Sequence, residues 1–386
     1  MSRVLFVVPP LVGHVNPTVA VGAELAARGH EVAWAGHPDL LAALLPAGAR
    51  VFPVAADTIR LLATGVGDRP AGMRGFAALK YLWQEFIIPL AQGMLPGVEA
   101  AIAAYAPDVV VADQQVLAGA AAARRAGIAW VTSVSTPAEL TRPLGAMPKV
   151  GEWITAQITA FQREIGVDDP VDLRFSDRLM LVFSTPELTG EVGGFAGKVV
   201  FTGPALAGRP ERGQFPWEWL DPGRRHLLVS LGTVNGEAGQ RFFRVAVEAL
   251  AGLGSELQAI LLCPPVPGAP DHVLFAEHVP QLALLPHLSA VVSHGGNNTV
   301  CETLAHGLPL VLAPIRDDQP VIAQQVADAG AGIRLSFARV SAPELRAAVR
   351  AVLDDPSYRH GAAKIAQSFA AAGGARAAAD HVEELL

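Results

Sequence analysis

The sequence is poor in cysteine and has no long apolar runs. It contains two cysteines in 386 residues, Cys263 and Cys301, and their spacing is not that of metal ligands. Two isolated thiols are typical of a protein in a reducing compartment rather than of a disulfide scaffold. No uninterrupted apolar segment reaches the roughly 18 to 20 residues of a membrane-spanning helix. Pro9-Pro10 breaks the apolar start of the chain early, which favours a first strand over a signal peptide. We therefore expect a soluble, cytoplasmic protein with no membrane span.

Charge is also scarce, with a small acidic excess. Only 17% of the residues are charged, and the net charge is −7 at neutral pH. A nucleic-acid surface needs clustered Lys and Arg, and an anionic membrane attracts basic segments, so both partners are disfavoured. No G-x-G-x-x-G opens either half of the chain, which argues against a nicotinamide dehydrogenase. Since 51% of the residues are hydrophobic, the chain can bury ample core.

What the sequence has is two series of alternating strand and helix patterns, which predict α/β domains with parallel sheets. The first series begins at Arg3, and the second begins at His226. Between them, residues 206–225 are rich in Pro, Gly and Arg, as interdomain linkers often are. We expect domains over 1–205 and 226–370, a linker over 206–225, and a helix over the Ala-rich segment 371–386.

Helix starts are predicted from capping residues. Pro17 suits the first position of a helix capped by Asn16, and Asn297 or Asn298 suits the cap of a later helix. Ser341, with Glu344 three residues on, is a capping-box pattern.

The chain is organised around the stretch that follows Ala290–Ser293, an apolar run typical of a buried parallel strand. His294-Gly295-Gly296 comes next and leads into a helix. Glycines permit a close backbone approach, and the positive end of a helix dipole binds anions, so this stretch predicts a phosphate site. Glu302 shares the face of this helix and could bind a ribose diol. Alternatively, the glycines form only a tight turn and His294 is a satisfied cap.

The wider order of residues is more specific. Pro280-Gln281 precedes the strand, the nine residues from His294 to Glu302 follow it, and Asp318-Gln319 comes after the next strand. This order resembles the donor-binding signature of the family 1 glycosyltransferases, which are nucleotide-sugar enzymes of the GT-B fold. The plant form reads Pro-Gln, a spacer, His-Cys-Gly-Trp-Asn-Ser-Thr-Leu-Glu, then Asp/Glu-Gln. The resemblance implies two Rossmann-like doubly wound domains facing a central cleft, with the C-terminal helix crossing back onto the first domain.

The resemblance also implies the donor-site residues. His294, Asn298 and Thr299 would hold the phosphates, with Gly232-Thr233 as a second phosphate loop. Val279 and Gln281 would meet the base, Glu302 the ribose, and Asp318-Gln319 the sugar hydroxyls. Asn297 replaces the Trp of the plant form, and Gly296 completes the turn. The predicted donor-binding residues are Gly232, Thr233, Val279, Gln281, His294, Gly296, Asn297, Asn298, Thr299, Glu302, Asp318 and Gln319.

The candidate catalytic residues are His14 and Asp113. Transfer to a hydroxyl needs a base that is active near neutrality, and a carboxylate on the other ring nitrogen would fix the histidine tautomer. His14 lies in Pro-x-x-Gly-His-x-x-Pro, which resembles the catalytic-histidine turn of the family, and Asp113 ends the strand that supplies the acidic partner. Alternatively, His14 is a loop cap and Asp113 an ordinary helix cap.

The first domain is expected to bind the acceptor. An apolar acceptor would need a wall of aromatic and polar side chains, although core packing is the more common role of such aromatics. The candidates are Phe76, Trp83, Phe86, Ser135 and Trp153.

The resemblance implies inverting transfer of a hexose to a hydroxyl of a hydrophobic natural product such as a macrolide or other polyketide. The resemblance implies that no metal and no cofactor is needed, with UDP-glucose or a dTDP-sugar as co-substrate. A monomer or homodimer is expected. Two alternatives remain open: a nucleotide-sugar epimerase of the same fold, and an inactive homologue that acts as a binding partner.

Overall fold

The computed structural model describes residues 1–54, 73, 75–141, 147–209, 213–232 and 236–386. The chain divides into two compact units, each built on a parallel sheet, and this confirms the predicted α/β fold class. Unit 1 comprises Met1–Pro186, Glu191–Pro210 and Ala372–Leu386, and unit 2 comprises Glu187–Gly190 and Glu211–Ala371. The segment 56–75 is rich in Gly, Arg and Asp, which predicts a surface loop, and it lies almost wholly outside the described residues.

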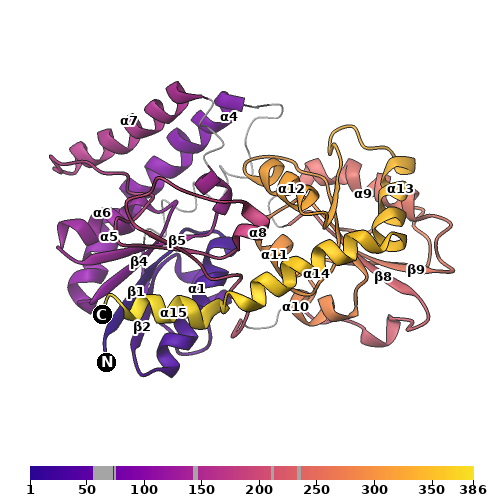
Figure 1. Cartoon of the computed structure of the whole chain (residues 1–386), viewed down its shortest axis with the longest axis horizontal. Helices are drawn as coiled ribbons and strands as arrows, with labels where there is room; N and C mark the ends of the chain where they lie inside the picture. The colour runs from indigo at the N-terminus through magenta and orange to yellow at the C-terminus, as the bar shows by residue number, and fades with distance from the viewer. Residues whose placement is uncertain (55–72, 74, 142–146, 210–212, 233–235) are drawn as a thin grey trace. The chain divides into compact units, whose positions relative to one another are not determined.

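Unit 1 contains a seven-stranded sheet in the order β3-β2-β1-β4-β5-β6-β7, and every described strand pair is parallel. Helices cover both faces of this sheet (Figure 1), which is why its strands are apolar on both sides. The strand order reverses between β1 and β4, where open α/β sheets bind ligands. The strands are β1 Arg3–Val7, β2 Glu31–Gly36, β3 Arg50–Pro53, β4 Val109–Asp113, β5 Ala129–Val134, β6 Leu179–Val182 and β7 Lys198–Phe201.

The helices of unit 1 include those that follow the strands and a long segment that begins at Gly75. They are α1 Val12–Ala27, α2 Pro38–Leu44, α4 Gly75–Tyr81, the π-helix η1 Leu82–Ile87, α5 Ile88–Tyr105, α6 Leu117–Arg125, the 3-10 helix η2 Pro137–Thr141, α7 Pro148–Glu164 and α15 Gly374–Glu383. The short helix α8, Pro186–Thr189, lies at the boundary of the two units.

Unit 2 contains a six-stranded parallel sheet in the order β10-β9-β8-β11-β12-β13, with its reversal between β8 and β11. The strands are β8 Arg225–Ser230, β9 Leu257–Leu262, β10 Val273–Ala276, β11 Ala290–Ser293, β12 Leu310–Leu312 and β13 Gly332–Arg334. The helices are η3 Trp217–Trp219, α9 Gly236–Leu250, α10 Gln281–Leu284, η4 Leu285–His287, α11 Asn297–Ala305, α12 Gln319–Asp328, α13 Ala342–Asp354 and α14 Pro356–Ala371.

Two of the predicted helix starts are wrong, and one is confirmed. Helix α1 begins at Val12 after an uncapped Leu11, so Pro17 lies inside the helix and His14 lies in its first turn. Helix α11 is preceded by Gly296, not by an asparagine cap. In α13, the Ser341 hydroxyl accepts from the Glu344 amide, and the Glu344 carboxylate accepts from the Ser341 amide at 2.8 Å. The capping box is therefore confirmed.

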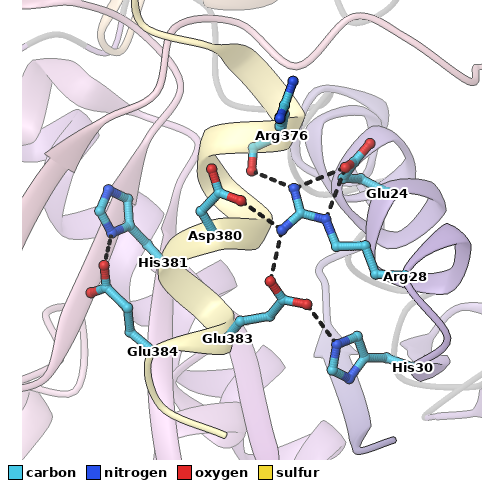
Figure 2. A network of polar contacts seen from close by, with 8 residues as sticks. All are labelled: Glu24, Arg28, His30, Arg376, Asp380, His381, Glu383 and Glu384. Carbon is cyan, nitrogen blue, oxygen red and sulfur yellow. Dashed lines mark hydrogen bonds and ion pairs between the residues drawn. The ribbon is translucent and has the colours of Figure 1, made fainter.

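The C-terminal helix α15 packs against α1 within unit 1 (Figure 2). The Arg28 guanidinium lies 2.6 Å from the Asp380 carboxylate and 2.7 Å from the Glu383 carboxylate. The other carboxylate oxygen of Glu383 lies 2.8 Å from the His30 ring. Ala378, Ala379 and Val382 of the same helix are buried in the apolar core of unit 1.

The helical segment Gly75–Tyr105 is long and apolar enough to cross a membrane by length and composition alone, although the sequence offers no uninterrupted apolar run of that length. Half of its most apolar window is buried within the protein. Leu90, Met94 and Val98 are fully buried in the core of unit 1. Core packing therefore accounts for the apolar character of this segment.

Candidate functional site

The first candidate site is a cluster of three polar side chains at the carboxyl ends of the unit 1 strands. His14 follows β1, Asp113 ends β4, and Ser135 directly follows β5. The His14 Nδ1 atom lies 3.0 and 3.1 Å from the two carboxylate oxygens of Asp113. The Ser135 hydroxyl donates to Asp113 at 2.6 Å and lies 2.7 Å from the same ring nitrogen. The two predicted catalytic residues are therefore in contact.

The surroundings of this cluster favour one histidine tautomer. The Asp113 side chain is fully buried and also accepts a hydrogen bond from the Gln115 amide at 2.9 Å, whereas the His14 side chain is 15% exposed. A buried carboxylate facing Nδ1 holds the proton on that nitrogen, so Nε2 is the nitrogen that can receive a proton. An arrangement of this kind is suited to a general base that is oriented by a carboxylate.

Ser135 belongs to this cluster, although the sequence suggested only an acceptor contact for it. Asp113 pairs with Ser133 in the β4–β5 register, so the chain reaches Ser135 just past the end of β5. The polar run that ends β5 could have predicted this role. The carboxyl ends of parallel strands lie together, and the end of the neighbouring strand β4 carries Asp113.

The predicted aromatic acceptor wall separates into two groups. Trp83 and Phe86 are each 3% exposed and belong to the core of unit 1. Phe76 is 46% exposed and makes an edge-to-face contact with Trp153, with ring centroids 5.4 Å apart. Core packing thus accounts for the first pair, and only the second pair leaves aromatic surface accessible.

A charged pair close to Asp113 was not predicted from the sequence. Glu139 lies on η2, just after Ser135, and its carboxylate is 3.8 Å from the Arg174 guanidinium. Arg174 is bound more closely by Asp172, with contacts of 2.9 and 2.7 Å. Burial raises the pKa of the Glu139 carboxyl, while Arg174 opposes this rise. This pair was not predictable from the sequence, because its members are far apart along the chain.

The second candidate site, in unit 2, is built around the His294 ring. A Cβ atom on Gly232 would lie 2.8 Å from the ring Cε1 atom, and one on Gly296 would lie 2.6 Å from Nε2. Neither position tolerates a side chain beside this ring, and Gly232 also has φ of 71°, which favours glycine. Gly296 has an ordinary φ of −63°, so its packing against the His294 ring, rather than the turn, requires glycine at this position.

Burial of His294 controls its charge. The residue is 9% exposed, and desolvation lowers the pKa of its imidazole to about 4, with a further contribution from the positive charge of Arg316. At neutral pH the ring is therefore uncharged, and it can hydrogen-bond a phosphate but cannot neutralise it.

Helix α11 begins next to this ring. The first turn of α11 contains Asn297, Asn298 and Thr299, all of them partly buried, and carries no acidic side chain. Its first intrahelical hydrogen bond runs from the Val300 amide to the Gly296 carbonyl at 3.0 Å. The positive end of the helix dipole thus lies at the carboxyl end of β11, as an anion site requires.

Two of the predicted donor residues are joined directly. The Gln281 side-chain amide donates to the Glu302 carboxylate at 2.5 Å, and Glu302 is 4% exposed. This bond fixes the orientation of a buried carboxylate one turn inside α11. Val279, two residues before Gln281, is 8% exposed.

The loop after β12 holds the last predicted donor residues. The Gln319 side-chain oxygen accepts from the Ile315 amide at 2.9 Å and from the Arg316 amide at 3.0 Å. The Gln319 side-chain oxygen therefore closes the loop. Asp318, at the start of α12, is partly buried, and Asp317 has a left-handed φ of 55°. Thr233 lies outside the described residues.

No group of three or more His, Cys, Asp or Glu side chains that could hold a metal ion occurs within the described ranges.

Comparison with known proteins gives consistent matches. Residues 261–385 match the family model of the erythromycin biosynthesis protein CIII-like C-terminal domain. The chain is 30% identical to 4'-demethylrebeccamycin synthase of Lentzea aerocolonigenes, with 100% of both chains covered. It is also 30% identical to demethyllactenocin mycarosyltransferase of Streptomyces fradiae, covering 100% of this chain and 87% of that protein. Among solved structures, the glycosyltransferase of kitacinnamycin has a TM-score of 0.79 and 26% identity, covering 100% of this chain and 99% of that chain.

Proposed function

The chain belongs to the natural-product glycosyltransferases of the GT-B fold, and from that premise we propose that it transfers a hexose from a nucleoside-diphosphate sugar to a hydroxyl of an apolar natural product such as a macrolide or other polyketide. In this proposal unit 1 (predicted as 1–205) activates the acceptor, and unit 2 (predicted as 226–370) binds the donor. The observation that carries it is the contact of His14 with Asp113 at 3.0 Å.

The proposed reaction is a single displacement. His14 Nε2 takes the proton of the acceptor hydroxyl while its oxygen forms a bond to the anomeric carbon of the donor. The bond from that carbon to the diphosphate oxygen breaks, and the nucleoside diphosphate leaves with the electron pair. Asp113 stabilises the imidazolium that forms, and Ser135 holds the carboxylate in place. Attack opposite the leaving group inverts the anomeric configuration, so an α-linked donor gives a β-glycoside.

The donor would be held by the turn at His294 and by the first turn of α11. Backbone amides and the helix dipole would stabilise the leaving diphosphate, so we propose that no metal is required. Glu302, oriented by Gln281, would accept hydrogen bonds from the ribose hydroxyls. Asp318 and the Gln319 amino group would orient the sugar, and a donor that lacks the matching hydroxyls would be rejected.

The donor proposed first is UDP-glucose, with dTDP-sugars as the next candidates. The name of the Streptomyces fradiae relative specifies a mycarosyl group, which supports testing sugars other than glucose. The two named relatives are a synthase and a transferase, so neither supports the epimerase alternative. An intact His14–Asp113 contact favours activity over an inactive binding partner. We propose a cytoplasmic monomer or homodimer with no cofactor.

The test measures release of nucleoside diphosphate from UDP-glucose and dTDP-sugars with a panel of phenolic and macrolide acceptors. We expect release only with an acceptor, and the His14→Ala variant should be slower by a factor of about 10² to 10⁴ because the general base is lost. Asp113→Asn should lose activity in the same direction. His360→Ala, which removes an exposed histidine on α14, is the matched control and should retain full activity.

A His14→Ala variant that stays within tenfold of wild type would refute the assigned base. If no nucleotide sugar releases nucleoside diphosphate with any acceptor, the result would favour an inactive homologue that acts as a binding partner. The NMR coupling constant of the anomeric proton in the product reports its configuration and so tests inversion. Unchanged transfer rates in EDTA would support the absence of a metal requirement.

A further inference from the structure

The proposed leaving group creates a charge problem in unit 2. A nucleoside diphosphate leaves with several negative charges, and the first turn of α11 contributes only the partial charge of a helix dipole. The buried His294 ring is neutral at working pH because its pKa is lowered to about 4. A permanent positive charge close to this turn would therefore have a clear use.

The loop after β12 brings one such charge to the turn. Strands β11 and β12 pair in parallel with Ser293 opposite Leu312, and the Ala313 amide donates to the Ser293 carbonyl at 2.8 Å. Beyond that point the two segments remain close: a Cβ atom on Gly295 would lie 3.3 Å from the Gln319 carbonyl oxygen. The loop that contains Arg316 thus packs on the glycine turn that follows β11.

The backbone of Arg316 is fixed in this loop. Its amide donates to the Gln319 side-chain oxygen at 3.0 Å, and the next residue, Asp317, turns the chain with φ of 55°. The Arg316 side chain is only 18% exposed, and its guanidinium is 3.8 Å from the Asp317 carboxylate. Its charge acts on the His294 ring, which places the guanidinium within electrostatic range of the proposed phosphate site.

We propose that Arg316 is a diphosphate-binding residue of the donor site and supplies the permanent positive charge that His294 lacks. This inference rests on the proposed donor site. A guanidinium presents N–H donors in a fork that matches phosphate oxygens, and it stays charged at every working pH. The alternative is that the Arg316 guanidinium pairs with the neighbouring Asp317 and does not contact the diphosphate.

The experiment measures dissociation constants by calorimetry for UDP and TDP and for the matching nucleosides uridine and thymidine. Wild type is compared with Arg316→Gln, Arg316→Lys and the matched control Arg224→Gln. Arg224 carries the same charge in an ion pair with Asp221. It lies just before β8, at the amino ends of the strands, whereas the glycine turn lies at their carboxyl ends. Thermal melting verifies that each variant is folded.

We expect Arg316→Gln to raise the dissociation constants of both diphosphates by about 10- to 100-fold, because a charged hydrogen-bond donor is lost. The dissociation constants of the nucleosides should stay within about twofold of the wild-type values. Arg316→Lys should recover part of the loss, and Arg224→Gln should match wild type. The dependence of diphosphate affinity on salt should be smaller in Arg316→Gln than in wild type.

Equal weakening of nucleosides and diphosphates would show that Arg316 only shapes the loop, and it would overturn the inference. Unchanged diphosphate affinity in Arg316→Gln would overturn it as well, while wild-type binding of UDP or TDP would leave the donor site standing. If wild type binds neither diphosphate, the proposed function fails together with the inference.

Discussion

At the scale of single residues, His294 links the stability of unit 2 to pH. Its folded pKa is about 4, below the ordinary value of 6.5, so the unfolded chain binds more protons between these values. Stability therefore falls as pH drops from 6.5 towards 4, by up to about 3 kcal/mol. We expect the free energy of unfolding of unit 2 to fall over this window, and His294→Gln to lose less between pH 7 and pH 4.5.

The measurement is denaturant unfolding of both proteins at the two pH values. His360→Gln, which changes an exposed histidine of the same unit, controls for general acid effects. If wild type and His294→Gln lose the same free energy between pH 7 and pH 4.5, the buried neutral ring is not the cause.

Which single residues meet was predictable only where strand ends carried the signal. His14 and Asp113 both follow buried apolar strands, and parallel strands place their carboxyl ends at one edge, so the sequence favoured their contact. The roles of Ser135 and Gln319 were not predictable in the same way. Each depends on a hydrogen bond of a few ångströms, set by strand register or loop conformation, which residue types alone do not determine.

At the scale of elements, strand and helix types were predictable, but helix starts were less so. Pro17 and Asn16 gave a strong start signal, yet α1 begins five residues before the proline with no side-chain cap. A cap contributes only about 1 kcal/mol, and tertiary contacts outweigh it. Here His14, in the first turn, is tied to Asp113 across the sheet edge. The Ser341 capping box succeeded because both of its bonds are local.

The element-scale prediction concerns α15, which the Arg28 network joins to α1 (Figure 2). Contacts with His30 and Arg28 lower the pKa of Glu383, so its contribution is present at neutral pH and is lost as pH falls through that lowered pKa. Arg28→Ala removes the bonds to Asp380, Glu383 and Glu24. We expect the melting temperature of unit 1 to fall by about 1 to 3 °C, because exposed ion pairs stabilise only weakly.

Hydrogen exchange of residues 374–383 is the direct measurement, and it should become faster in Arg28→Ala. Arg50→Ala, which removes an exposed ion pair between β3 and β2, is the matched control. Unchanged exchange in α15 would mean that the buried Ala378, Ala379 and Val382 hold the helix without help from the polar network.

At the scale of the whole molecule, the two α/β units were predictable from the alternation of patterns, whereas their exact membership was not. Residues 187–190 belong to unit 2, where the Gln325 side chain donates to the Thr189 carbonyl at 3.0 Å. Residues 372–386 belong to unit 1 through the packing of α15 on α1. Such contacts join residues far apart in sequence, and a local change of composition does not report them.

Two units with separate cores predict that a donor-site ligand stabilises only one of them. A ligand at about 100 times its Kd adds about 2.7 kcal/mol to the unit that binds it, so the unit 2 melting temperature should rise by about 5 to 10 °C with UDP or TDP. The unit 1 transition should stay within about 1 °C of its ligand-free value. Differential scanning calorimetry measures both transitions, and Arg224→Gln should respond as wild type does. A single transition that shifts as a whole would show that the units unfold as one cooperative body, contrary to this expectation.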